Sequence, residues 1–178
     1  MGETTDGTPS ADAGTSDGTS GGTGEQRVVS AEREVAAPAA TVFELIADPA
    51  RQPSWDGNDN LAELVRGDRL TGVGQVFAMR LTSDAVRDNH VVAFTEGRLV
   101  AWRPSVEGEA PIGHEWRWQV EPIDEAHSRV RHTYDWTDLT DETRIPRARA
   151  TGEPQLRASL DRLAAAAETA AAAETSEG

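Results

Sequence analysis

The chain has 178 residues, a formal net charge of −14 and no cysteine. This length suffices for one domain with a substantial core, and the lack of cysteine excludes disulfides, thiolate nucleophiles and sulfur metal ligands. All 17 basic residues are arginine, and the excess of acid would repel nucleic acid and anionic membranes. No run reaches the roughly 20 apolar residues that a membrane-spanning helix needs. We therefore expect neither nucleic-acid binding nor membrane insertion.

The first 26 residues are almost entirely Gly, Thr, Ser, Asp, Ala and Glu. Such a segment cannot bury enough apolar surface to offset the entropy lost on ordering, so residues 1–26 are predicted to form a disordered acidic tail. They have neither the basic nor the apolar region of a secretion signal, so a cytoplasmic location is expected. We place the folded domain at 27–170 and expect a second short disordered tail at 171–178.

The predicted domain begins with a strand and a helical segment. Residues 27–37 alternate between apolar and polar side chains, which is typical of a strand. Residues 38–55 follow a helical pattern, because Val42 and Ile46 share one face and Pro38 suits a first helical turn. Asp48 and the proline after it end the first helix, so short helices are expected after strand one.

The rest of the chain predicts an antiparallel meander followed by one long helix. Short alternating runs are separated by Gly, Asp, Pro or Ser, and they cover 61–67, 72–83, 88–97, 98–106, 113–122 and 128–138. The segment 151–173 then carries an apolar stripe at helical spacing, with Thr151 as a plausible N-cap; the stripe consists of Leu156, Leu160, Leu163 and Ala167.

One sheet of about seven strands followed by one amphipathic helix has a simple solution. The sheet curves, and the apolar stripe of the helix lies across its concave face. A closed lipocalin-like barrel is the alternative, but up-and-down barrels join successive strands by hairpins. The helical segment after the first strand therefore favours the open, curved sheet.

Several segments, taken in chain order, resemble one known family: EREVAAPAATVFELIADPARQPSWDG, GRLVAWRP, WRWQVEPIDEAHSRVRHTYDW and the closing leucine- and alanine-rich helix. They are similar to the polyketide cyclase/dehydrase-like branch of the START-like (SRPBCC) superfamily. The resemblance implies an α+β helix-grip fold, in which a curved seven-stranded antiparallel sheet wraps around a long C-terminal helix. It also implies a deep apolar cavity between the two, which binds a hydrophobic small molecule of polyketide-, lipid- or aromatic-like character.

The superfamily leaves other functions open, since one fold supports many of them. One alternative is a polyketide cyclase or dehydratase that acts by positioning its substrate and transferring protons. Another is a co-chaperone-like module that binds a protein partner. We expect no cofactor and no metal, because the four histidines show no ligand spacing with carboxylates. A homodimer through an edge strand or the long helix is also possible.

Strand parity selects the residues expected to face the cavity, because successive side chains point to opposite faces. His114, Trp116, Trp118 and Val120 share one face of their run, and Val130, His132, Tyr134 and Trp136 share one face of the next, while charged side chains take the other faces. The same rule places Leu81, Val92 and Val100 inward. The predicted ligand-binding residues are Trp55, Phe77, Met79, Phe94, Trp102, His114, Trp116, Trp118, His132, Tyr134 and Trp136.

Each of these residues could instead belong to a packed core, and for single tryptophans that interpretation is favoured. His114, His132 and Tyr134 argue for a cavity together, because polar tips left without partners in a dry core cost about 1 to 3 kcal/mol each. In an enzyme these three would transfer protons. Asp56 is expected beside Trp55 at the cavity mouth or as a turn cap, and Arg144, Arg147 and Arg149 lie in a predicted loop that is either solvated, a gate, or a contact for an acidic ligand group.

Overall fold

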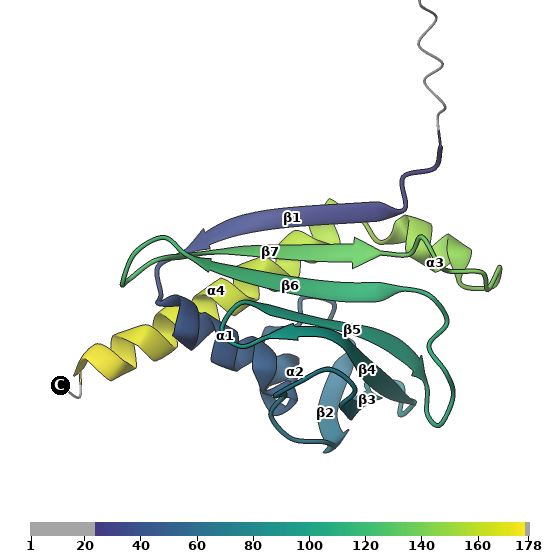
Figure 1. Cartoon of the computed structure of the whole chain (residues 1–178), viewed down its shortest axis with the longest axis horizontal. Helices are drawn as coiled ribbons and strands as arrows, with labels where there is room; N and C mark the ends of the chain where they lie inside the picture. Colours follow the sequence, from purple (N-terminus) through teal and green to yellow (C-terminus); the bar gives the residue numbers. More distant parts are fainter. Residues whose placement is uncertain (1–23, 177–178) are drawn as a thin grey trace, which may run out of the picture.

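The structure is a computed structural model that describes residues 24–176 (Figure 1). The predicted N-terminal tail, 1–26, lies outside the described residues except for its last three positions. The chain forms strands and helices in the following order: β1 (Val28–Val35), α1 (Ala39–Ala47), a 3-10 turn η1 (Pro49–Arg51), α2 (Gln52–Trp55), β2 (Leu61–Arg66), β3 (Val76–Leu81), β4 (Val86–Thr95), β5 (Leu99–Val106), β6 (Glu115–Pro122), β7 (Ser128–Asp135), α3 (Ile145–Ala150) and α4 (Glu153–Ser176).

All seven strands belong to one antiparallel sheet in the order β1-β7-β6-β5-β4-β3-β2. Strands β2 to β7 are joined as successive neighbours, whereas β1 pairs with β7 at the opposite end of the chain. Figure 1 shows the curved sheet with the long helix α4 crossing it, and α4 contacts β1, β7, α1 and α2. The predicted helix-grip architecture is confirmed. No helix within residues 24–176 is long and apolar enough to cross a membrane.

The core lies between the sheet and these helices. The predicted stripe of α4 is buried, with Leu156, Leu160 and Leu163 each at most 1% exposed. Full burial of one such leucine side chain contributes about 1.5 to 3 kcal/mol. The predicted alternation of β7 is also confirmed: Val130, His132 and Tyr134 are buried, and the residues between them point outward.

Strand β4 departs from simple alternation. A register shift between Val91 and Ala93 marks a β-bulge, so Val91 is buried while Val92 is 37% exposed. The prediction that Val92 faces inward is therefore wrong. An extra residue in one strand reverses the parity of everything before it, so Arg87 and Asn89, on the N-terminal side of the bulge, face the concave side.

The helices also differ from the predicted pattern near the C-terminal end. The loop predicted around the arginines of 144–149 contains the short helix α3. Helix α4 runs to Ser176, so the tail predicted at 171–178 begins inside it. Alanine has the highest helix propensity, and residues 164–173 are mostly alanine without glycine or proline. The helix therefore continues after its buried stripe has ended.

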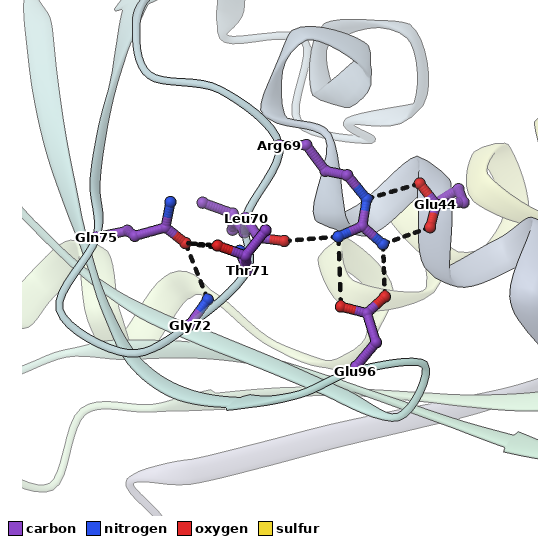
Figure 2. Close-up of polar contacts among 7 residues, drawn as sticks. All are labelled: Glu44, Arg69, Leu70, Thr71, Gly72, Gln75 and Glu96. Atoms are coloured by element: carbon purple, nitrogen blue, oxygen red, sulfur yellow. Dashed lines mark hydrogen bonds and ion pairs between the residues drawn. The ribbon is translucent and has the colours of Figure 1, made fainter.

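The loop between β2 and β3 is fastened to helix α1 through Arg69 (Figure 2). The Arg69 guanidinium donates to both Glu44, with a 2.8 Å bond from Nε to Oε2, and Glu96, with a 2.5 Å bond from Nη2 to Oε1. Next to it, the backbone N–H of the buried Leu70 donates to the carbonyl of Ala47 at 2.7 Å. Since Glu96 lies in the β4–β5 turn, this network links α1 to two loops of the sheet.

Candidate functional site

A cavity of about 180 Å³ lies between the sheet and helices α2, α3 and α4. One ordered water needs roughly 10 to 15 Å³ of such volume, so the cavity has room for a small organic molecule. Most of its wall is apolar, formed by Trp55, Leu61, Met79, Trp102, Ile112, Trp116, Trp118 and Leu139.

Strands β6 and β7 supply a continuous wall of stacked rings. In their register Trp116 lies opposite Tyr134 and Trp118 lies opposite His132. The Trp118 and His132 rings stack at 3.6 Å between centroids, and Trp116 stacks on Tyr134 at 4.3 Å. Directly opposite side chains of antiparallel strands lie close enough for such contacts, so the W-x-W spacing of β6 and the alternating rings of β7 build one surface. The ring of Trp55 packs edge-on against that of Trp118, with 5.1 Å between the ring centroids.

The titratable groups in this wall are held in their neutral forms. Burial lowers the pKa of His132 to about 3, and its Nδ1–H donates to the carbonyl of Arg117 at 3.2 Å. Burial, followed by the positive charges of Arg144 and Arg147, lowers the pKa of His114 to about 4. Burial raises the pKa of Tyr134 to about 12. At neutral pH the wall therefore offers two neutral imidazoles and a phenol.

Three cavity-lining residues carry a buried polar atom that has no hydrogen-bond partner within residues 24–176, namely Asp56 Oδ2, His114 Nδ1 and Trp118 Nε1. Trp55 shows the contrast, since its Nε1–H donates to the carbonyl of Leu45 at 3.0 Å. Each unpartnered atom costs about 1 to 3 kcal/mol. Burial also raises the pKa of the Asp56 carboxyl. Three of the four such side-chain atoms within residues 24–176 thus lie at the same cavity, and the fourth is Ser128 Oγ, which does not line it.

The structure separates the predicted site residues into two groups. The cavity is lined by Trp55, Met79, Trp102, His114, Trp116, Trp118, His132 and Tyr134. The remaining three are packed elsewhere: Phe77 lies edge-on to Trp102 at 5.5 Å, Phe94 lies edge-on to Phe43 at 5.9 Å, and Trp136 lies beneath the Arg27 guanidinium at 4.7 Å. These side chains form core and surface contacts away from the cavity.

Sequence reasoning missed much of the polar lining. Arg87 and Asn89 of β4 line the cavity only because of the bulge, and the sequence carries no glycine or proline there to signal it. Ser159 of α4 also lines it, and its Oγ accepts a hydrogen bond from the backbone N–H of Gly57 at 3.0 Å. Arg144 and Arg147 line the cavity, while Arg149 of the same predicted loop is not among the lining residues.

The described residues, 24–176, contain no group of three or more His, Cys, Asp or Glu side chains arranged to hold a metal ion.

The sequence matches the family model described as polyketide cyclase / dehydrase and lipid transport over residues 26–168. The chain belongs to this family. It is 34% identical over 117 residues to uncharacterized protein Rv0088 of Mycobacterium tuberculosis, a match that covers 61% of this chain and 47% of the relative. The chain thus spans about half the length of the curated relatives it matches.

Solved structures share the fold of this family member. A solution structure from Thermobifida fusca has a TM-score of 0.58 at 22% identity, covering 78% of this chain and 91% of that one. Norcoclaurine synthase from Thalictrum flavum, in complex with dopamine and hydroxybenzaldehyde, has a TM-score of 0.52 at 17% identity and covers 77% and 83%. At these identities the likeness establishes the fold alone.

Proposed function

We propose that this family member binds a hydrophobic small molecule with aromatic, polyketide-like or lipid-like character in the cavity between the sheet and α4. The observation that carries the proposal is the coincidence of two features in one place. The cavity wall is made of stacked aromatic rings, and the same wall contains buried polar atoms without partners in residues 24–176. An apolar ligand with a few hydrogen-bonding groups would contact the rings and supply those partners.

The site supports ligand binding better than it supports catalysis that depends on proton transfer. A general acid or base works best when its pKa lies near the working pH. The pKa values of His132 and His114 are lowered to about 3 and 4, and that of Tyr134 is raised to about 12. The three proton-transfer candidates of a cyclase or dehydratase are therefore poorly matched to neutral pH, whereas neutral rings suit the recognition of an apolar ligand.

Calorimetric titration with a panel of neutral ligands tests the proposal, using a dihydroxyanthraquinone, 2-naphthamide and a long-chain alcohol. We expect saturable binding with a negative heat-capacity change, because apolar surface is buried. Replacement of Trp116 by Leu should weaken binding roughly two- to tenfold, the value of an aromatic contact.

Trp136 provides the matched control, because it is a buried tryptophan that does not line the cavity. Trp136→Phe should leave the ligand affinity unchanged. Absence of saturable binding by every member of the panel, or equal losses in the Trp116 and Trp136 variants, would contradict the proposal.

A further inference from the structure

Almost every arginine of this acidic chain is paired with a carboxylate. Within residues 24–176, the arginines without a salt bridge are Arg87, Arg98 and Arg147, and two of these, Arg87 and Arg147, line the cavity. A third lining arginine, Arg144, reaches a carboxylate only at 3.9 Å, from its Nε to Asp141 Oδ2. The cavity therefore collects two arginines without a salt bridge and a third with only a long one, although the net charge is −14.

Two of these cations act on the same part of the cavity. Arg144 precedes α3 and Arg147 lies within it, and the charges of both reach the imidazole of His114. The charge of Arg147 also reaches the phenol of Tyr134, whose ring lies 5.9 Å from that of His114. The α3 end of the cavity thus combines positive charge with two neutral hydrogen-bonding rings.

The cavity offers little negative charge to balance these arginines. Among its lining residues the one acidic side chain is that of Asp56. Asp56 follows α2 and lies against α4, where the Nη1 of Arg162 donates to its backbone carbonyl at 2.9 Å. Burial raises the pKa of the Asp56 carboxyl, which favours its neutral form. An anionic group on a ligand would therefore meet attraction at the α3 end and little opposing charge.

We propose, building on the cavity binding proposed above, that the ligand is an aromatic or aliphatic carboxylic acid whose carboxylate is held by Arg144 and Arg147. Its apolar body lies against the rings of Trp116 and Tyr134. The guanidinium fork matches the two oxygens of a carboxylate and holds them through charge-assisted hydrogen bonds. The hydroxyl of Tyr134, protonated at neutral pH, is a further donor at the same end.

Two probes of equal shape and different charge test this inference: 2-naphthoate and 2-naphthamide. Calorimetric titration of the full chain at low salt should show naphthoate binding roughly fivefold more tightly than naphthamide, as expected for a partly exposed ion pair. In Arg147→Gln this preference should fall to within about twofold, because naphthoate loses more affinity than naphthamide does. Naphthamide binding that persists also shows that the variant is folded.

Arg149→Gln is the matched control, because Arg149 belongs to the same helix, carries the same charge, pairs with Glu25 and does not line the cavity. It should retain the full preference for naphthoate. Equal binding of the two probes by the unmodified chain would overturn the proposal of a carboxylate ligand and leave the proposed cavity binding intact. An equal loss of the preference for naphthoate in the two arginine variants would do the same. Failure of both probes and of the neutral panel to bind would overturn the proposed function and this inference together.

Discussion

The imidazole of His132 lies between two tryptophans, stacked on Trp118 at 3.6 Å and on Trp116 at 5.4 Å. It is 3% exposed, and within residues 24–176 its hydrogen bond runs from Nδ1–H to the Arg117 carbonyl. A charged imidazolium would lose its hydration among these apolar groups, so burial lowers the pKa of His132 to about 3. The ring is therefore neutral in the folded protein at neutral pH. The histidine thus behaves as part of the aromatic wall.

This burial makes stability depend on pH in a defined direction. The unfolded chain protonates His132 with a pKa of about 6.5, whereas the folded chain does not until about 3. Between those values the unfolded state binds more protons, so stability is lost as the pH falls below 6.5. Lowering the pH from 7 to 5 should cost about 2 kcal/mol through this residue alone.

Urea unfolding at both pH values measures this effect. His132→Gln retains a donor for the Arg117 carbonyl and removes the titrating group, so its free energy of unfolding should fall by about 2 kcal/mol less between pH 7 and 5 than that of the unmodified chain. A loss of stability identical in the two proteins would show that His132 titrates normally in the folded state.

At the level of single residues, the sequence was most informative where a strand is regular. Parity correctly separated buried from outward positions in β7, because the strand is uninterrupted and pairs with β6 and β1 throughout its length. It could not separate cavity wall from packed core: Trp118 and Trp136 are each nearly fully buried, yet Trp118 lines the cavity and Trp136 does not. That difference depends on the tertiary packing around each ring, and no local pattern contains this information.

At the level of elements, the approach of α4 to the segment after α2 depends on Gly57. A Cβ at this position would lie 2.3 Å from the backbone nitrogen of Ser159 and 2.5 Å from the carbonyl carbon of Ala158. Backbone atoms of a helix cannot yield as a flexible side chain would, so Gly57→Ala should push α4 outward. We expect a loss of about 1 to 3 kcal/mol in the free energy of unfolding, as for other overpacked cores.

Gly72 supplies the comparison, because a Cβ there would meet no atom within 4 Å and its backbone does not adopt a positive φ. Chemical denaturation of Gly72→Ala should give a change within about 0.5 kcal/mol. If Gly57→Ala were equally neutral, the close contact between α4 and this segment would not be a property of the protein.

The elements that the sequence failed to predict have identifiable causes. Helix α3 is short and contains Pro146 and two arginines, with a third, Arg144, just before it, a composition that resembles a solvated loop. The bulge in β4 lies within a run of ordinary strand residues. Both features are set by how the segment packs in the folded chain, and both add polar side chains to the cavity wall.

At the level of the whole molecule, the stripe of α4 closes the core against the sheet. Leu160 is buried at 1% exposure in the middle of this stripe. Leu160→Ala should lower the free energy of unfolding by about 2 to 5 kcal/mol through lost contacts and the cavity left behind. Arg157, exposed on the same helix and paired with Glu153, is the control, and Arg157→Ala should change stability by no more than about 0.5 kcal/mol. Equal effects in denaturant titration would contradict this role of the stripe.

The architecture could be predicted from the sequence because the spacing of apolar residues changes clearly between the helical segments and the strands. A helical segment, alternating runs separated by turn residues, and a final amphipathic helix follow one another with little ambiguity, and Leu156 to Ala167 specify the buried face of α4. The resemblance to the family then fixed how these elements assemble. The cavity itself, its unpartnered polar atoms and its arginines required the three-dimensional arrangement.

The pairing of β1 with β7 bears on how the chain folds as it is synthesised. Ser30 of β1 meets Thr133 of β7, 103 residues later, so the first strand of this domain has no partner within the sheet until most of the domain has been synthesised. Strands β2 to β7 can form progressively from neighbouring hairpins, whereas distant pairings of this kind slow folding. β1 must then dock together with α4, to which it is tied by Arg33 and Asp161. The first and last elements of the domain therefore meet only when the domain is nearly complete.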